Sequence, residues 1–372
     1  MSLFLIDAGK EWRGGQRQSF FLAKELKRNG YSFQFVVQPG SPLHQKASDA
    51  GLPVLPLKIS SEADALSILR LSLAMKRKKC RLVNFHDAHS VAVGSAAASL
   101  AKVPIKVIST RVDFPLKKNV LSRRKYTKNA DAIIAISEGV KNVLVEGGID
   151  AKRIHIIPDG IDFAPHEDKT SKDYLRRELS FAPDDFLVGI VAQLSDDKGH
   201  KYLIQTSKHL RESTPKIKII IVGGGPLQLE LNKQVKEIQG EDMVFFLGFR
   251  EDIPQILNSL DVFVLSSDHK GLGGIIIDAM ACRLPVVATR VGGILEVVDH
   301  QNTGLLVRPQ RPKSLAKAIL KMYEDRELAH RLGQRGYEDV HQKFSVESMA
   351  SKAIDLYEEL AKKKGVKLLR SV

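Results

Sequence analysis

Short apolar runs rich in β-branched residues alternate with amphipathic stretches along nearly the whole chain, and this alternation most strongly limits the possible folds. Strands that are apolar along their length and separated by helical patterns are typical of a parallel sheet with helices on both faces. The sequence therefore predicts an α/β protein with two doubly wound parallel sheets. The first series of strands is predicted at 3–6, 33–37, 54–57, 82–85, 106–109, 132–136 and 154–157. The second series is predicted at 187–192, 217–222, 244–247, 262–265, 286–289 and 304–307.

The alternation pauses over the polar stretch 158–174, which predicts a connection between two domains. The chain has 372 residues, more than the size at which a single hydrophobic core keeps growing. We expect an N-terminal Rossmann-like domain over 1–165 and a C-terminal Rossmann-like domain over 166–344. The tail after the last strand is predicted to form three helices. Its final part, about 345–372, has no strand of its own to cover, so we expect it to cross back to the first domain.

The composition is that of a soluble globular protein, with 43% hydrophobic and 27% charged residues. Apolar runs such as 91–101 are little more than half of the roughly 18 residues that a membrane-spanning helix needs. The first residues lack the basic region and the long apolar stretch of a secretion signal. Cys80 and Cys282 are too few for a disulfide framework and have no metal-ligand spacing. We therefore expect a cytoplasmic protein.

The net charge of +14 is concentrated in the first half of the chain. Residues 1–165 carry 26 Lys and Arg against 14 Asp and Glu, whereas 166–350 are close to neutral. The basic clusters at 76–81 and 123–125 have four possible interpretations. They can contact an anionic membrane surface, an acidic acceptor or nucleic acid, or they can simply form a solvated basic face. Aromatic residues are only 6% and do not interleave with the basic runs, which argues against nucleic acid. We favour peripheral contact with the inner face of the cytoplasmic membrane.

Loops at the carboxyl ends of the strands are expected to carry the chemistry, and we expect the loops of the two sheets to line one cleft. After the first strand, Gly14-Gly15-Gln16 precede a helical pattern and can present N–H groups to an anion or a sugar hydroxyl. In the second half, Gly223-Gly224-Gly225-Pro226 follow a strand. Gln228 stands where the usual dinucleotide fingerprint needs glycine. A plain turn is the alternative interpretation of both loops.

Three further positions have residue types that suit binding of a charged ligand. Asp278, one turn into the helix that follows a glycine-rich loop, can accept hydrogen bonds from ribose hydroxyls. Lys198 follows a buried strand and can neutralise a departing diphosphate. His86 can be a metal ligand, a structural histidine or a contact to the donor sugar. Because the segment 86–89 offers no obvious fourth ligand, the metal interpretation is weak and we prefer the sugar contact.

A set of short segments follows one another in a specific order along the chain. They are Gly14-Gly15-Gln16, His86, Ile156-Ile157-Pro158-Asp159-Gly160-Ile161-Asp162, Lys198-Gly199, Gly223-Gly224-Gly225-Pro226, Leu247-Gly248-Phe249-Arg250, Gly271-Leu272-Gly273, Asp278-Ala279-Met280-Ala281, Val291-Gly292-Gly293-Ile294-Leu295-Glu296 and Phe344-Ser345. Together they resemble the retaining glycosyltransferases of family 4, whose two-domain fold is called GT-B. The resemblance covers nearly the whole chain.

The resemblance implies a role for each matching position. Lys198 would contact the donor diphosphate, His86 would approach the anomeric carbon, and the backbone around Phe249 would frame the base. The residues expected at the reacting centre are His86, Lys198 and Lys270. Those expected to bind the donor are Gly15, Gln16, Gln193, Gly225, Phe249, Arg250, Gly271, Leu272, Gly273 and Asp278. The resemblance also implies no divalent metal and no cofactor, since the nucleotide sugar is a substrate; a UDP-sugar is favoured over a GDP- or ADP-sugar.

Two positions depart from the family pattern. The family usually has two glutamates separated by seven residues, and Lys270 and Asp278 occupy those positions here. Gln193 stands where many members have an arginine beside the diphosphate. We expect Asp278 to keep the ribose contact, and Lys270 or Arg250 to supply the missing positive charge.

The function expected from these observations is transfer of a sugar, with retention of configuration, to a saccharide or a lipid-linked saccharide of the cell envelope, such as a lipopolysaccharide core. Arg111 and Asp113 in the basic first domain are the expected acceptor-binding residues. A sugar-nucleotide-binding protein that has lost catalysis, or a sugar-nucleotide epimerase of the same fold, is the alternative. A dehydrogenase would need the dinucleotide fingerprint that the first domain lacks.

Overall fold

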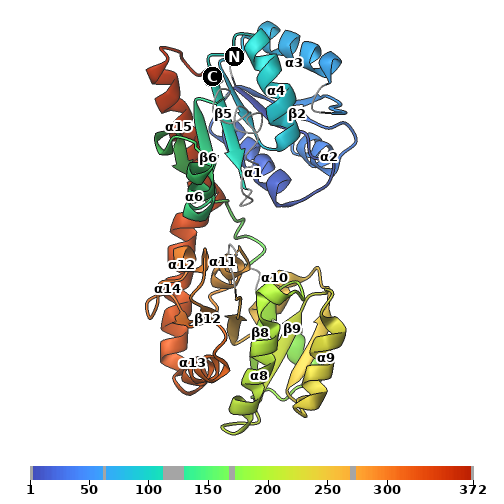
Figure 1. Ribbon diagram of the computed structural model, residues 1–372, viewed down its shortest axis with the longest axis vertical. Coiled ribbons are helices and arrows are strands. Elements are labelled where there is room, and N and C mark those ends of the chain that lie inside the picture. Colours follow the sequence, from blue (N-terminus) through green and yellow to red (C-terminus); the bar gives the residue numbers. More distant parts are fainter. Residues whose placement is uncertain (1–2, 62–63, 112–129, 167–171, 269–273, 370–372) are drawn as a thin grey trace. The chain divides into compact units, whose positions relative to one another are not determined.

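The computed structural model describes residues 3–61, 64–111, 130–166, 172–268 and 274–369. The chain divides into two compact units: unit 1 comprises Met1–Gly160 and Val346–Val372, and unit 2 comprises Ile161–Ser345. Each unit contains a sheet whose described strand pairs are all parallel (Figure 1). The predicted α/β architecture with two doubly wound parallel sheets is therefore confirmed.

The sheet of unit 1 has seven strands in the order β3-β2-β1-β4-β5-β6-β7. The strands are β1 (Leu3–Asp7), β2 (Phe33–Val37), β3 (Val54–Pro56), β4 (Leu82–Phe85), β5 (Ile105–Thr110), β6 (Ala132–Ala135) and β7 (Ile154–Ile156). The described helices are α1 (Gly14–Arg28), α2 (Pro42–Asp49), α3 (Ala65–Arg77), α4 (Ala88–Leu100), α6 (Glu138–Glu146), the 3-10 turn η1 (Ala151–Arg153) and α15 (Val346–Lys363). Every strand start and end lies within one residue of its predicted position.

Side chains of successive strand residues point to opposite faces of this sheet, so each strand contributes to two hydrophobic clusters. Leu3 and Leu5 belong to the cluster that contains α1, α2 and α15, whereas Phe4 and Ile6 belong to the cluster that contains α3, α4 and α6. Burial on both faces explains why the strands are apolar throughout.

Helix α15 is an integral part of unit 1, although unit 2 separates it from the rest of that unit in sequence. It packs against α1. Its Tyr357 is fully buried and its hydroxyl lies 2.6 Å from Asn84 Nδ2, while the same amide group lies 3.1 Å from Ser109 Oγ. This buried polar contact fixes the helix over β4 and β5.

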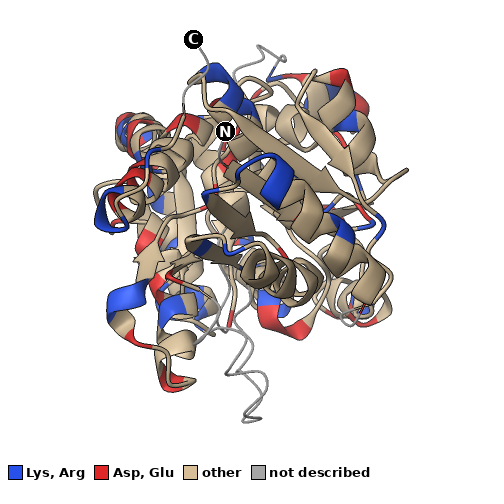
Figure 2. Ribbon diagram, turned by 90° about the horizontal axis from the view of Figure 1, so that it is seen from above, with Lys and Arg blue, Asp and Glu red and all other residues tan. Residues whose placement is uncertain are grey.

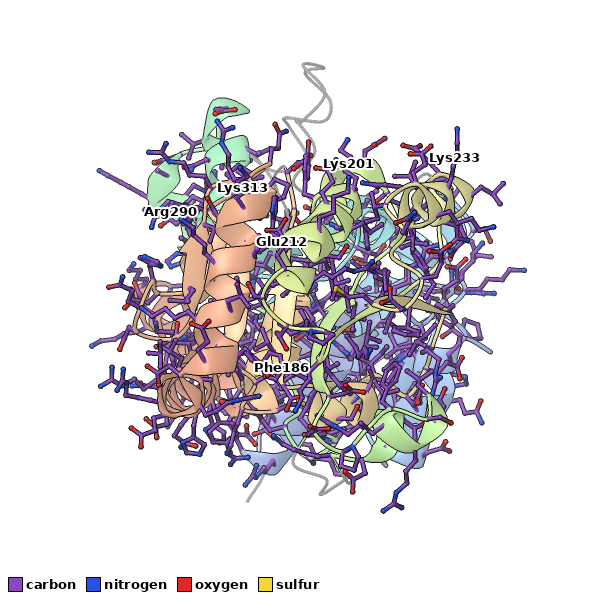
Figure 3. The ribbon with its side chains drawn as sticks, turned by 90° about the horizontal axis from the view of Figure 1, so that it is seen from below. Phe186, Lys201, Glu212, Lys233, Arg290 and Lys313 are labelled. Carbon is purple, nitrogen blue, oxygen red and sulfur yellow. The ribbon has the colours of Figure 1, made fainter. Side chains whose placement is uncertain are left out.

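The sheet of unit 2 has six strands in the order β10-β9-β8-β11-β12-β13. The strands are β8 (Phe186–Val191), β9 (Ile217–Val222), β10 (Val244–Gly248), β11 (Val262–Leu265), β12 (Val286–Thr289) and β13 (Leu305–Val307). The helices are α7 (Tyr174–Glu178), the 3-10 turn η2 (Asp196–Lys198), α8 (His200–Arg211), α9 (Gln228–Glu237), α10 (Ile253–Ser259), α11 (Gly274–Ala281), α12 (Ile294–Val297), α13 (Pro312–Glu324) and α14 (Arg326–Phe344). Helices α8, which carries Lys201 and Glu212 at its two ends, and α13, which carries Lys313, pack side by side (Figure 3).

Charged side chains lie mainly on the helices and connections, and the strands are mostly uncharged (Figure 2). In the part of the chain that the structure describes, no helix has both the length and the apolar character needed to cross a membrane.

Candidate active site

The strand order identifies one switch point in each sheet, where neighbouring strands lead to helices on opposite faces and ligands of such sheets bind. In unit 1 it lies between β1 and β4, and in unit 2 between β8 and β11. His86 and Lys198 follow β4 and β8, and Gln16 lies in the first turn of α1, directly after the loop that follows β1; all three were singled out by the sequence analysis.

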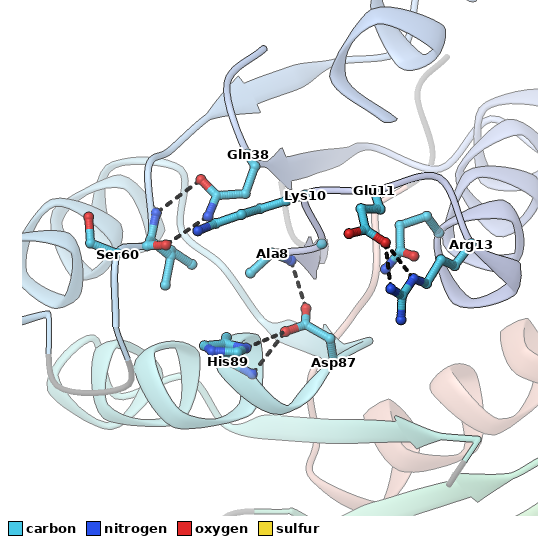
Figure 4. Close-up of a pocket in the computed structure, with 11 residues that line it drawn as sticks. Ala8, Lys10, Glu11, Arg13, Gln38, Ser60, Asp87 and His89 are labelled. Atoms are coloured by element: carbon cyan, nitrogen blue, oxygen red, sulfur yellow. Dashed lines mark hydrogen bonds and ion pairs between the residues drawn. The ribbon is translucent and has the colours of Figure 1, made fainter. Parts of the chain in front are cut away.

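A pocket of about 350 Å³ lies at the carboxyl edge of the unit 1 sheet (Figure 4). The loops after β1, β2, β3 and β4 form its wall. The lining residues are Ala8, Gly9, Lys10, Glu11, Arg13, Gln16, Gln38, Ile59, Ser60, Asp87 and His89. A second hollow of about 550 Å³ shares Lys10, Gln38, Ile59 and Ser60 with it. The two hollows therefore form one polar depression above the ends of these strands.

The floor of this pocket is held by the buried carboxylate of Asp7, the last residue of β1. Its Oδ1 accepts hydrogen bonds from Gln16 Nε2 and from the Gly9 amide, both at 3.0 Å, and its Oδ2 accepts one from Ser19 Oγ at 2.7 Å. An added Cβ on Gly9 would lie 2.3 Å from Gln16 Nε2, so a larger residue here would displace the Gln16 side chain from its present position. Sequence reasoning missed Asp7; the signal was a carboxylate that ends an apolar strand.

The glycine pair lies inside α1, which begins at Gly14, and not directly before the helix as expected. No side chain caps this helix start. Neither Gly14 nor Gly15 has a positive φ, and an added Cβ would meet nothing within 4 Å at either position. Neither backbone conformation nor packing among the described residues requires glycine at these two positions, so the expected role of the pair in ligand binding stays a prediction.

His86 follows β4 and is buried, and among the described residues neither of its ring nitrogens has a hydrogen-bond partner. Burial, with the nearby positive charge of Arg111, lowers the pKa of His86 to about 3, so the ring is neutral. The next residue, Asp87, caps α4 through the His89 and Ser90 amides and accepts a hydrogen bond from the Ala8 amide at 2.6 Å. A buried neutral imidazole without a protein partner is suited to a hydrogen bond with a bound ligand.

The lowered pKa of His86 predicts that acid destabilises unit 1. In unit 2, burial lowers the pKa of His200 to about 4, which predicts the same effect for that unit. The unfolded histidines have pKa values near 6.5, so below that pH the unfolded chain binds protons that the folded chain excludes. The free energy of unfolding therefore falls as the pH drops from 6.5, by up to about 1.4 kcal/mol per pH unit for each histidine. Urea unfolding at pH 7.5 and 5.0 measures this. His200→Gln should reduce the loss in unit 2, and equal stability of the unmodified chain at both pH values would contradict the prediction.

Arg111 follows β5, and its Nε donates to Asp159 Oδ1 at 2.8 Å. Its buried Nη1 has no partner among the described residues, so part of the guanidinium remains available to an anionic group. Asp113, the other expected acceptor-binding residue, lies outside the described residues, as does the basic cluster at 123–125.

In unit 2, Lys198 ends the short turn η2 directly before α8, and its Nζ lies 2.8 Å from Asp197 Oδ2. Ser266, after β11, donates from its hydroxyl to the carbonyl oxygens of Lys198 and Gly199. No side chain caps the start of α8. The lysine therefore lies beside the uncapped start of α8 at the switch point, an arrangement that suits a diphosphate.

The glycine-rich loop 223–225 packs against the loop that follows β8. A Cβ on Gly225 would lie 2.5 Å from the carbonyl oxygen of Leu194, and one on Gly223 would lie 2.0 Å from that of Ala192. Gly224 has nothing within 4 Å of an added Cβ. Two of these three glycines are therefore explained by contact between the loops, which supports the plain-turn interpretation for them.

Gln193 and Phe249 are exposed at the edge of the same sheet, and 78% of the Phe249 surface is accessible. Arg250 has other partners. Its guanidinium pairs with Glu178 at 2.5 Å and Asp252 at 2.6 Å, and its Nη2 lies 3.1 Å from the Tyr174 hydroxyl. The hypothesis that Arg250 replaces the arginine missing at position 193 is therefore not supported by this arrangement, because its donors are already paired.

Asp278 lies on α11, and its Oδ1 is 3.1 Å from Nε2 of the buried His166. His166 Nδ1 lies 3.0 Å from the carbonyl oxygen of Asp162, so this nitrogen donates. His166 had not been singled out from the sequence, where a single histidine in a polar connection has no distinguishing signal. The carboxylate expected to bind ribose is thus oriented by the connection that precedes the unit 2 sheet.

Lys270, Gly271, Leu272 and Gly273 lie outside the described residues, so their expected roles stay predictions. Within the described ranges, no group of three or more His, Cys, Asp or Glu side chains is arranged to hold a metal ion.

Two family models match the chain and together cover most of it. The model described as Glycosyltransferase Family 4 matches residues 12–164, and the one described as Glycosyl transferases group 1 matches residues 171–339.

Relatives in several bacteria align with most of the chain. The capsular polysaccharide biosynthesis glycosyltransferase CapM of Staphylococcus aureus is 25% identical over 91% of this chain and 92% of its own length. An Escherichia coli enzyme named UDP-Gal:alpha-D-GlcNAc-diphosphoundecaprenol alpha-1,3-galactosyltransferase is 27% identical over 85% of this chain and 86% of its own. The mannosylfructose-phosphate synthase of Agrobacterium fabrum is 27% identical over 78% of this chain, but the match spans only 65% of that enzyme.

Among solved structures, Anabaena HepE in complex with UDP superimposes with a TM-score of 0.80 over 96% of this chain and 100% of its own, at 22% identity. At that identity the likeness establishes the fold. Two Rossmann-like parallel-sheet domains define the GT-B class of proteins. The two family matches identify the family: the chain belongs to the glycosyltransferases that combine a family 4 domain with a group 1 domain. The resemblance found in the sequence is confirmed.

Proposed function

We propose that the protein transfers a sugar from a nucleoside-diphosphate sugar, in the first instance a UDP-sugar, to a saccharide or lipid-linked saccharide in cell-envelope glycan synthesis. The observation that carries the proposal is Lys198, fixed beside the uncapped start of α8 at the switch point of unit 2. The names of relatives support the substrate classes, since the Escherichia coli enzyme acts on a sugar attached to diphosphoundecaprenol and HepE binds UDP and UDP-glucose.

The reaction we propose retains the anomeric configuration and needs no metal ion. The acceptor oxygen bonds to the anomeric carbon on the face from which the diphosphate departs, the bond between that carbon and the diphosphate oxygen breaks, and the departing oxygen takes the acceptor proton. Lys198 and the first N–H groups of α8 stabilise the negative charge that grows on the diphosphate. Trapping of a covalent sugar–enzyme adduct would contradict this front-face path.

The polar depression of unit 1 is the acceptor site in this proposal. Arg111, whose charge acts on His86, is a further acceptor contact, and His86 stays the contact to the donor sugar. The positive charge of the first half of the chain suits an acceptor held at an anionic surface. We propose that the protein works in the cytoplasm as a peripheral protein on the inner face of the cytoplasmic membrane.

Calorimetric titration with UDP, GDP, ADP and their sugars tests the donor site. We expect UDP and one UDP-sugar to bind, and Asp278→Asn to weaken that binding by about tenfold, the effect of losing one charge-assisted hydrogen bond. His166→Gln should weaken it less, because the carboxylate stays in place. Glu324→Gln, an exposed acidic residue of the same unit on α13, is a matched control.

This titration, together with analysis of the products formed with and without an acceptor, separates the candidate functions. Binding of a nucleotide sugar without transfer to any acceptor would favour a protein that has lost catalysis. Conversion of the donor in the absence of an acceptor would favour an epimerase. If no nucleotide and no nucleotide sugar binds, the proposed transfer is wrong.

A further inference from the structure

Helix α3 in unit 1 exposes a row of leucines. Leu66, Leu69 and Leu73 have 56%, 54% and 51% of their surface accessible, and they follow one another at spacings of three and four residues. Residues at this spacing share one face of a helix. Three of the nine large hydrophobic side chains exposed on the described chain are thus gathered on one helix face.

This leucine row is not the face of α3 that packs into the hydrophobic core, because a different face of the helix does so. Leu71 and Met75 of the same helix are almost fully buried in the cluster that contains β1 and β4, and Ser67 is buried beside Lys58 with its hydroxyl donating to the Lys58 carbonyl at 2.7 Å. The helix is therefore apolar on two sides, one toward the sheet and one toward solvent. An outward apolar face of this kind is typical of a surface that meets a partner.

Cations accompany the leucines on the outward side of α3. Arg70, Lys76 and Arg77 are exposed within the helix, and Lys78, Lys79 and Arg81 follow it. Among the described residues, none of these six forms an ion pair with a carboxylate. Asp64, which caps the start of the helix, is close enough to interact electrostatically with Arg70. The surface thus combines apolar side chains with cations, of which those from Lys76 to Arg81 have no carboxylate partner among the described residues.

The end of α4 extends this surface. Helices α3 and α4 pack together on the same face of the sheet and both lead into the starts of strands, so their C-terminal ends lie at the same edge (Figure 1). There Leu100 is 55% exposed, and Lys102 is exposed two residues later.

We propose that the basic leucine face, defined as Leu66, Leu69, Leu73 and Leu100 with the cations of 70–81, binds the surface of an anionic phospholipid bilayer. Leucines that enter the boundary between headgroups and acyl chains, flanked by lysines and arginines that meet anionic headgroups, are the features of interfacial helices. The charge of the face selects the bilayer over an uncharged partner, and like charges disfavour a second copy of the same face.

This inference rests on the proposed function, and it adds a route for the acceptor. The connection that leads into α3 is part of the wall of the polar depression: Lys58 and Ser60 line it, and the Ser60 amide donates to Asp64 at the helix start at 3.1 Å. The start of α3 therefore lies next to the depression, so a bilayer bound along α3 meets the unit that contains the proposed acceptor site.

Sedimentation with sucrose-loaded vesicles tests the basic leucine face. The full chain should bind vesicles of phosphatidylglycerol mixed with phosphatidylcholine and bind pure phosphatidylcholine poorly. L66Q/L69Q/L73Q should weaken binding to the anionic vesicles by about tenfold or more, as expected when the inserted apolar area is lost. K76Q/R77Q/K78Q/K79Q should weaken it comparably and reduce its dependence on salt, because four of the six cations of the face are neutralised. Leu229→Gln and Leu295→Gln replace exposed leucines of unit 2 and should leave binding unchanged.

The result that overturns the inference is vesicle binding by the triple leucine variant equal to that of the unmodified chain. A change in sedimentation velocity of this variant, without a change in vesicle binding, would instead assign the face to contact between copies. Titration of the same variant with UDP-sugar reports on the donor site in unit 2, so failure of the bilayer contact and failure of the proposed transfer are distinguishable.

Discussion

Replacing Lys198 with alanine is expected to lower kcat by about 10²- to 10³-fold, the usual loss when one group that stabilises transition-state charge is removed. The side chain is 29% exposed, and its ammonium group is held 2.8 Å from Asp197 beside the start of α8. Since charge grows on the diphosphate only as the sugar leaves, the effect should appear in kcat more than in KM. Steady-state kinetics with the donor identified by titration measure both constants.

Lys201 provides the matched control for this prediction. It carries the same charge at the second residue of α8 (Figure 3). Its Nζ lies 3.7 Å from Asp196, and its side chain is more exposed than that of Lys198. Lys201→Ala should change kcat less than about twofold, because an exposed ion pair contributes little. Lys198→Arg should recover part of the activity. If Lys198→Ala kept the kcat of the unmodified chain, Lys198 would have no role in the departure of the diphosphate.

The second large effect is expected from Gly199→Ala, which should destabilise unit 2 by about 3 kcal/mol. Gly199 has a φ of +64°, where an alanine costs about 1–2 kcal/mol, and an added Cβ would lie 2.0 Å from the carbonyl oxygen of Ser266. The clash is with backbone, so relief requires the loops after β8 and β11 to separate. Thermal unfolding followed by circular dichroism measures the loss.

Gly224→Ala is the control for this substitution. Gly224 lies at the same edge of the sheet but has no positive φ and nothing within 4 Å of an added Cβ, so the change should stay within about 0.5 kcal/mol. Equal stability of the two variants would mean that the contact between Gly199 and Ser266 is not needed for the fold of unit 2.

The fold could be predicted from the sequence because its determinants are local patterns. Ile217–Val222, for example, combines β-branched residues with burial on both faces, so its composition alone marks a central strand. The start of α1 was misplaced because glycine has a low helix propensity, whereas the structure includes Gly14 and Gly15 in the first turn. The residues at which a helix begins and ends depend on its capping partners more than on the residues of the helix itself.

The candidate site could be predicted in part, where a residue's role follows from its own loop. Lys198 and His86 were found because each lies in the connection that follows an apolar strand. The partners of Arg250 and Asp278 could not be found this way, since Glu178 and His166 come from distant parts of the sequence and are brought near only by the fold. A charge can be assigned from sequence, but whether a neighbour already neutralises it depends on the tertiary structure.

The assignment of α15 to unit 1 has a consequence for synthesis on the ribosome. Unit 2 is inserted between Gly160 and Val346 of unit 1, and its two ends are joined by the hydrogen bond from the Ile161 amide to the Phe344 carbonyl. All the residues of unit 2 therefore emerge before the helix that covers one face of the first sheet. Until Tyr357 reaches Asn84, that face of β4 and β5 lacks its cover, so the half of the protein made first is the half completed last.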